Sequence, residues 1–229
     1  MKKYLILVLI SFSIHLNAQK PIYGEVTYLV SLKKENAKKT KSKDSLISRK
    51  VKELFKNSRD VNFILEFNAN ESIYKKSKIL KNDLDTSINL TEIMAGNNNL
   101  YYHNLSENSN VMVMNIGGKD FIISKPKAEW QLLNESKTIG NYLCYKAIMK
   151  DNNKVIAWYT PSITVSHGPN SFNGLPGLII ELSNKMLIFS VTKINISKTS
   201  KIKKIIKPVK GQKLTYEEFK KKFGGVFEE

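Results

Sequence analysis

Residues Val61–Leu80 read VNFILEFNANESIYKKSKIL, and this stretch decides the fold class. Apolar and polar residues alternate through Val61–Asn68, as they do in a strand with one buried face. The tripeptide Asn68-Ala69-Asn70 has the chemistry of a turn, and Ser72–Leu80 then resumes a strand pattern. Because two strands joined by so short a turn pair antiparallel, this stretch predicts a β-hairpin.

Further strand patterns lie on both sides of this hairpin. Upstream, Tyr23–Leu32 alternates and is rich in β-branched and aromatic residues. Downstream, turn signals such as Gly117-Gly118-Lys119 and Asp151-Asn152-Asn153 separate short apolar segments. The strands predicted there are Leu100–Leu105, Val111–Ile116, Phe121–Ser124, Trp130–Leu133, Tyr142–Met149, Val155–Thr160, Gly177–Leu182 and Met186–Ile196. Many short, closely spaced strands predict a mainly β fold (minor α+β), an antiparallel curved sheet or a partial β-barrel.

Two helices are predicted beside these strands. Asp44 can cap a helix over Ser45–Asn57, inserted after the first strand, with apolar side chains at helical spacing. We expect this helix to lie against the sheet. Thr215 with Glu218 three residues later forms a capping-box pattern, which predicts a short C-terminal helix over Tyr216–Phe223. The polar stretch Asn82–Glu92 is expected to be turn-like, with room for a short helix.

Residues 1–18 have the pattern of a secretory signal peptide. Lys2 and Lys3 precede an apolar run, and Ala18-Gln19 offers a cleavage position. No cysteine follows the run at the position that a lipid anchor needs, so we expect no lipoprotein. No later stretch of the sequence is long and apolar enough for a transmembrane helix. We therefore expect a periplasmic or secreted protein whose mature part, residues 19–229, forms a single domain.

The net charge of +17 is concentrated in two segments of the chain. These are a Lys-rich insert, 33–60, and a Lys-rich tail, 193–213, and the rest of the mature chain is neutral by formal charge. Proteins that bind nucleic acid generally use Arg for base edges and aromatic rings for stacking. The tail has neither residue type. We therefore expect no nucleic-acid partner, whereas contact with an anionic membrane surface or partner stays open.

The segment Asn173–Glu181, NGLPGLIIE, is similar to the signature of the GLPGLI family, an exported family from the Bacteroidota. The resemblance extends over most of the mature chain. It is supported by Phe63–Asn68 with Glu71–Tyr74, by residues of Trp130–Ala147, by Trp158-Tyr159-Thr160-Pro161, and by Gly168-Pro169 and Phe172. The resemblance implies that the protein is exported and has a β architecture. It implies no mechanism, since the family has no established activity, cofactor or catalytic residue.

The signature region is also a candidate recognition loop. The sequence Leu175-Pro176-Gly177-Leu178 fits a type II turn, in which Pro presets φ and Gly supplies a positive φ. A structural role for this turn is the first interpretation, and a rigid recognition loop is the second. The candidate residues are Trp158, Tyr159, Pro161, His167, Gly168, Pro169, Phe172, Gly174, Leu175, Pro176, Gly177 and Leu178.

The titratable residues suggest no complete catalytic or metal-binding motif. His103 and His167 are expected in exposed loops, and Cys144 is expected to be a buried inert thiol. A nucleophilic Cys144–His167 pair is the weaker, enzymatic hypothesis. The carboxylates that the fold could bring together are Glu66, Glu71 and Glu181. We therefore predict no catalytic, cofactor-binding or metal-binding residue.

These patterns favour a non-enzymatic binding or carrier module for an apolar ligand or peptide. The predicted strand order is similar to that of the open half-barrels of periplasmic lipoprotein-localisation carriers, which cradle acyl chains. The ligand, or the helix at 45–57, would then fill the concave face of the sheet. The alternative is an accessory protein that contacts an outer-membrane partner or a membrane surface through the signature loop and the basic segments.

Overall fold

The computed structural model describes residues 22–33, 46–78, 87–197 and 204–224. Their strands form one twelve-stranded sheet with the order β12-β6-β5-β4-β3-β2-β1-β11-β10-β9-β8-β7. The strands are β1 (Tyr23–Leu32), β2 (Val61–Asn68), β3 (Glu71–Lys76), β4 (Leu100–Asn104), β5 (Ser109–Ile116), β6 (Lys119–Ser124), β7 (Trp130–Ile139), β8 (Tyr142–Met149), β9 (Ile156–Thr160), β10 (Leu178–Ser183), β11 (Leu187–Ser197) and β12 (Gln212–Thr215). The described helices are α2 (Leu46–Asn57), α3 (Leu90–Met94) and α4 (Tyr216–Phe223). The predicted mainly β class is confirmed.

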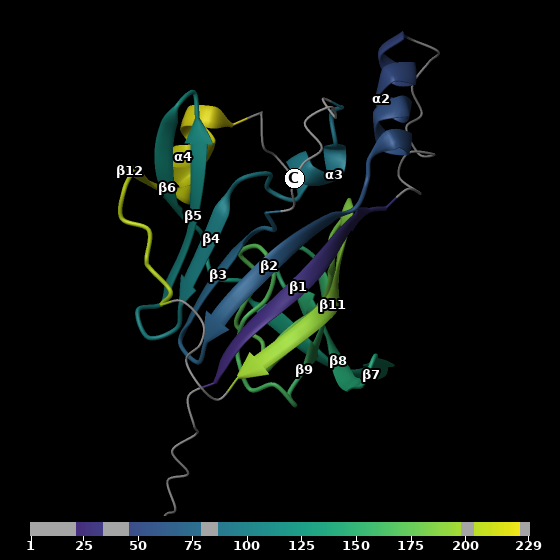
Figure 1. The fold of residues 1–229 in the computed structure, drawn as a ribbon, viewed down its shortest axis with the longest axis vertical. Coiled ribbons are helices and arrows are strands. Elements are labelled where there is room, and N and C mark those ends of the chain that lie inside the picture. Colours follow the sequence, from purple (N-terminus) through teal and green to yellow (C-terminus); the bar gives the residue numbers. More distant parts are fainter. Residues whose placement is uncertain (1–21, 34–45, 79–86, 198–203, 225–229) are drawn as a thin grey trace, which may run out of the picture.

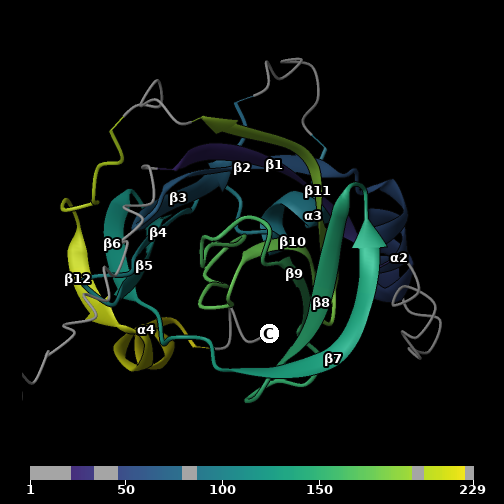
Figure 2. The same ribbon diagram turned by 90° about the horizontal axis from the view of Figure 1, so that it is seen from below.

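The sheet curls around a hydrophobic core but does not close into a barrel (Figure 2). Alternate residues of β1 point to the concave side, where Val26, Tyr28 and Val30 are fully buried. β2 adds Phe63, Leu65 and Phe67 to the same core by the same alternation. A period of two along β1 and β2 thus produces one apolar and one more polar face, as the sequence predicts.

The predicted strands and their turns are present, most of them with changes of one or two residues at their ends. The exceptions are β7, which runs to Ile139 instead of ending at Leu133, and β3, which ends at Lys76 before the predicted Leu80. The β2–β3 hairpin turns at Asn68–Asn70, and the β5–β6 hairpin turns at Gly117 and Gly118, both of which have positive φ. The strand that the sequence does not reveal is β12, four residues that begin at the end of the Lys-rich tail. It pairs parallel with β6, whereas the other strand pairs are antiparallel. Its strand geometry therefore depends on a partner far away in the sequence.

Both predicted helices are present, but the position predicted for the first one is wrong. Figures 1 and 2 show that α2 lies beyond the end of the sheet and outside the curved interior. Among its described side chains, Phe55 packs against the core, while Val51 and Leu54 are half-buried. Asp44 and the linker before it fall outside the described residues. The concave side is occupied by residues of the segment 161–177, which leaves no free surface there for α2.

The C-terminal helix α4 packs at the β6 end of the curved sheet (Figure 2). The Thr215 side chain accepts a hydrogen bond from the Glu218 backbone N–H, and the Glu218 carboxylate accepts one from the Thr215 N–H. This is the predicted capping box. Phe219 is buried, and its ring and that of Phe121 both pack against Phe223. None of the helices in the described part of the chain has the length and apolar character needed to cross a membrane.

Candidate functional site

The concave face of the sheet is filled by the chain's own loop 161–177, called here the interior loop. Figure 2 shows it as a green segment inside the curved sheet, between β9 and β10. Its residues Ile163, Val165, His167 and Leu175 are each at most 3% exposed. The expectation that the helix at 45–57 fills this face is therefore wrong. The interior loop carries most of the candidate recognition residues, and burial of this kind points to a structural role for them.

Side chains from three strands and a backbone carbonyl from a fourth hold the interior loop and the start of β10. The Tyr28 hydroxyl on β1 donates to the Ile179 carbonyl at 2.6 Å. The Trp130 indole N–H on β7 donates to the Asn173 carbonyl at 2.8 Å. The Asn110 side-chain amide on β5 donates to the Ser171 and Pro126 carbonyls. His167, from the loop itself, contacts the Asn68 carbonyl on β2 at 3.0 Å. Hydrogen bonds at buried and partly buried positions such as these fix the loop, because breaking one leaves a polar group unpaired.

The turn at Pro176 is not the type II turn that the sequence predicts. A type II turn would place the Leu178 N–H against the Leu175 carbonyl. The Leu178 N–H instead donates to the Ile163 carbonyl at 3.1 Å, and the Gly177 N–H donates to the Leu175 carbonyl at 2.8 Å. The latter bond closes a three-residue turn centred on Pro176. The turn is tighter because the backbone on both sides of it bonds to neighbouring segments.

His103 and His167 form a buried pair, so the prediction of two exposed loop histidines is wrong. Their Nδ1 atoms are 3.3 Å apart, and their rings meet edge-on with centroids 5.5 Å apart. His103 is 8% exposed, and His167 is fully buried. His103 lies on β4 directly across from Asn110 on β5. The pair therefore joins the interior loop to the middle of the sheet.

The hydrogen bonds determine the tautomer of each neutral ring. A carbonyl oxygen only accepts, so Nε2 of His167 carries the proton that is donated to Asn68. Nδ1 of neutral His167 is then an acceptor, and Nδ1–H of His103 donates to it. Nε2 of His103 is left with a lone pair. If His103 takes up a proton at this nitrogen, the hydrogen bond from His103 to His167 and the one from His167 to the Asn68 carbonyl stay unchanged.

Burial holds both histidines in the neutral form. Burial, and to a smaller extent the nearby Lys127 ammonium, lower the pKa of His103 to about 4. The pKa of His167 is lowered to about 3, first by burial and then by the charge that His103 would carry. The hydrogen bond to the Asn68 carbonyl acts in the opposite direction. Two rings with such low pKa values are neutral at pH 7.

Cys144 on β8 is fully buried, as predicted. Its Sγ contacts the Tyr142 carbonyl at 3.5 Å, and both ring nitrogens of His167 are engaged with other groups. Burial raises the pKa of the thiol, although Lys137 acts to lower it. These contacts give no support to a Cys144–His167 nucleophilic pair, which would need direct hydrogen-bond contact or one bridging water.

We expect Cys144 to react with 5,5′-dithiobis(2-nitrobenzoate) at least about 100-fold more slowly in the folded protein than in urea, because the thiolate is both rare and inaccessible. The release of thionitrobenzoate followed by absorbance checks this. The same reaction on free cysteine at the same pH is the control for the reagent. Equal rates in buffer and in urea would show that the thiol is exposed.

The other candidate residues do not converge on a catalytic centre. Trp158 is half-buried on β9, with the Lys137 ammonium 4.4 Å from its ring centroid. Phe172 packs against Trp130, and Pro161 and Pro176 are exposed. The three carboxylates considered from the sequence have separate partners: Glu66 pairs with Lys75, Glu71 accepts from Tyr102, and Glu181 pairs with Lys137.

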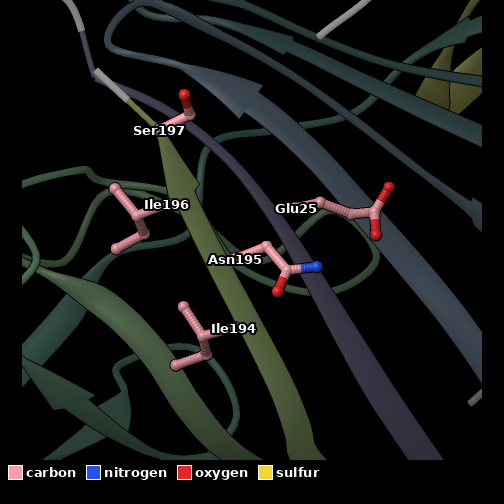
Figure 3. Close-up of a pocket in the computed structure, with 5 residues that line it drawn as sticks. All are labelled: Glu25, Ile194, Asn195, Ile196 and Ser197. Carbon is pink, nitrogen blue, oxygen red and sulfur yellow. The ribbon is translucent and has the colours of Figure 1, made fainter. Parts of the chain in front are cut away.

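An open hollow of about 450 Å³ lies over the ends of β1 and β11. It is lined by Glu25, Ile194, Asn195, Ile196 and Ser197. Figure 3 shows that Ile194 and Ile196 point to one side of β11, whereas Asn195 and Glu25 point to the other. The polar and apolar side chains therefore do not face a common space, which a binding pocket requires.

The described residues offer little chemistry for a cofactor or a metal ion. Among them, no group of three or more His, Cys, Asp or Glu is close enough to hold a metal. The Ser171 Oγ and Asn173 Oδ1 atoms are buried without a hydrogen-bond partner in the described structure. Buried polar atoms of this kind are suited to ordered water. Tyr28, Asn68, His103, Asn110 and Trp130 hold the interior loop and had no role assigned from the sequence.

A family model described as "Protein of unknown function (Porph_ging)" matches residues 148–181. This stretch runs from the end of β8 through β9 and the interior loop into β10, and it contains the signature region. The chain is therefore similar to this family over that stretch. The match is consistent with a family from the Bacteroidota, and the finer assignment to the GLPGLI family stays a prediction. A search of curated proteins finds no match.

The fold is similar to that of PNGF-II, solved in the P21 and C2 space groups. The TM-scores are 0.55 and 0.53, with 16% sequence identity in both comparisons. The likeness covers 87% of this chain but only 33% and 32% of the PNGF-II chains. The chain thus spans about a third of the length of PNGF-II. At this identity the likeness shows a shared fold and says nothing of a shared function.

Proposed function

We propose that this protein is an exported, non-enzymatic interaction module of the GLPGLI family that contacts its partner through the outer face of the sheet. The observation that supports this most strongly is the interior loop, which occupies the face where a carrier would hold its ligand. An apolar ligand on that face would have to displace Ile163, Val165 and Leu175. The outer face and the basic tail remain available for contact.

The proposed export of the protein rests on the sequence of residues 1–18. The Lys pair, the apolar run and the Ala18-Gln19 position favour export to the periplasm or the medium after cleavage. The fold likeness adds that a module of this shape occurs within a longer chain, since it matches about a third of PNGF-II.

The signature residues have a structural role in this proposal. His167, Leu175 and Leu178 are buried, and Gly168 and Gly177 lie against neighbouring chain atoms. The exposed positions of the interior loop are few, among them Pro161 and Pro176. The basic tail is the better candidate for contact, because Lys204, Lys210 and Lys213 are exposed on it.

We expect replacement of Lys204, Lys210 and Lys213 by Gln to release the protein from the envelope fraction of expressing bacterial cells at low salt. The matched control replaces Lys50, Lys52 and Lys154, which are also exposed, and it should stay bound with the wild type. Fractionation followed by immunoblotting measures the distribution. All three purified proteins should fail to bind palmitate by native mass spectrometry.

Two results would contradict the proposal. Stoichiometric palmitate binding by the wild type would support a carrier. An envelope association that is the same in the wild type and in the tail variant would exclude the tail as the contact surface. The palmitate arm tests the concave face, and the fractionation arm tests the outer face.

A further inference from the structure

The outer face of the sheet has a second hydrophobic cluster, separate from the concave core. Its buried members on β3–β6 are Ile73, Tyr102, Val111 and Ile122. The segment 204–211, called here the outer segment, runs toward β12 and contributes Ile205 to this cluster, where it is 8% exposed. Ile205 therefore anchors the outer segment to the sheet.

The residues next to this anchor point outward. Ile206 is 73% exposed and Val209 is 71% exposed, the two highest values among the large hydrophobic residues that the structure describes. An isolated exposed apolar residue is common on protein surfaces, but two of them on one short segment held in place by a buried neighbour need an explanation. Because Ile205 fixes the segment, Ile206 and Val209 are held away from the core.

Lysines surround these two apolar side chains. Lys204, Lys207 and Lys210 are exposed on the same segment, and the tail 193–213 contains no Asp or Glu. Of the acidic residues on the adjoining strands and hairpin loops, Glu107 pairs with Lys207. Glu71 and Asp120 accept hydrogen bonds from the neutral Tyr102 hydroxyl and Asn115 amide and keep their negative charges. The lysines of the outer segment and β12, namely Lys204, Lys207, Lys210 and Lys213, outnumber these three carboxylates, which leaves an excess of positive charge on this surface.

We propose that the outer segment binds the surface of a lipid bilayer that contains anionic headgroups. This inference rests on the proposed interaction function and names its partner. The lysines would contact the headgroups, and Ile206 and Val209 would enter the boundary between the headgroups and the acyl chains. A fluid bilayer offers anionic headgroups to the lysines and an apolar layer to Ile206 and Val209, although these side chains line no common pocket. A folded acidic protein would need a groove shaped to receive the two apolar side chains.

The test is co-sedimentation of the full mature protein with vesicles of phosphatidylcholine containing about 30 mol% phosphatidylglycerol, at about 50 mM salt. We expect binding to these vesicles and little binding to pure phosphatidylcholine. I206S with V209S should weaken binding about fivefold, and K204Q with K210Q about tenfold. The matched apolar control is I88S with I93S, since Ile88 and Ile93 are 58% and 54% exposed. It should bind as the wild type does.

Each remaining outcome counts against the proposal. Failure of the wild type to bind anionic vesicles overturns it. Loss of binding in the lysine variant but not in the apolar variant indicates a purely electrostatic contact, as with a soluble polyanion, and also overturns it. If envelope association in cells persists while vesicles are not bound, the partner is a protein; the interaction function then survives and the lipid inference fails. Circular dichroism of each variant confirms that it is folded.

Discussion

Replacement of Gly177 by Ala is expected to lower the free energy of unfolding by about 3–5 kcal/mol. A Cβ atom at this position would lie 2.1 Å from the Thr160 carbonyl oxygen, 2.6 Å from its carbonyl carbon and 2.9 Å from the Pro161 nitrogen. All three are backbone atoms. They cannot move aside without disturbing the pairing of Thr160 with Leu178, where β9 meets β10. The clash is therefore relieved only by breaking part of the sheet or of the interior loop.

Urea denaturation followed by circular dichroism measures this loss, and P176A is the matched control. Pro176 is exposed, so its replacement removes little packing. We expect it to cost about 1 kcal/mol or less, mainly by increasing the conformational freedom of the unfolded chain. If G177A and P176A unfold at the same urea concentration, the close approach of Gly177 to Thr160 does not constrain the fold. A large loss in G177A alone shows that the signature glycine is needed for folding.

The strands could be predicted because each has its own local signal. Alternation in Tyr23–Leu32 and Val61–Asn68 requires only that one face be buried, and both strands are present with those bounds. The capping pair Thr215 and Glu218 is equally local. β12 has no such signal. It is stabilised by its parallel pairing with β6, and its four residues are too few to show an alternation of apolar and polar side chains.

The interior loop could not be predicted because its burial depends on the curvature of the whole sheet. Its proline and glycine residues are typical of a surface loop. A weak signal was present in the alternation of Ile163, Val165 and His167, all of which are buried. The same limit applies to α2: an apolar helical face predicts that a helix packs somewhere, but not which surface is free to receive it.

The histidine pair could not be predicted because 64 residues separate its members. Their contact requires β4 to lie beside β5 in one register and the interior loop to cross the concave face. A lone histidine in a sequence is more often exposed than buried, which explains the wrong prediction. The glycine beside His167, Gly168, is the one local feature of the sequence that fits a buried position. In the structure, a Cβ added at Gly168 would lie 2.6 Å from the Phe172 carbonyl oxygen, so the backbone there is tightly packed.

Acidification from pH 7 to about pH 4.5 is expected to lower the free energy of unfolding by about 3 kcal/mol through His103 and His167. In the unfolded chain both rings titrate near the ordinary histidine value of 6.5, whereas in the folded protein the pKa values are about 4 and 3. A group whose pKa is lowered by folding stabilises the folded state fully above its unfolded pKa. That contribution is lost as the pH falls from 6.5 toward the folded value, because the unfolded chain then binds more protons.

The groups around the pair explain why protonation is unfavourable in the folded protein. The Lys127 ammonium opposes a charge on His103, a charge on His103 opposes one on His167, and the Phe67 ring packs against His167. The Asn68 carbonyl favours the charged form of His167. Protonation of both rings would also remove the acceptor of the bond between the two Nδ1 atoms. Since water reaches the edge of His103, we expect less than the full effect of two isolated buried groups.

Urea denaturation at several pH values between 7 and 4.5 measures this dependence, with H103Q as the comparison. Its side-chain amide can still donate to Nδ1 of His167 but does not titrate, so we expect about half of the histidine contribution to disappear. Carboxylates contribute equally to both proteins. Glu218, whose pKa is lowered by hydrogen bonds to Thr215, is one of them, so the difference between the two curves isolates the contribution of His103. Parallel curves for the wild type and H103Q would show that folding does not lower the pKa of His103, and burial of His103 against His167 would then impose no electrostatic cost on its protonation.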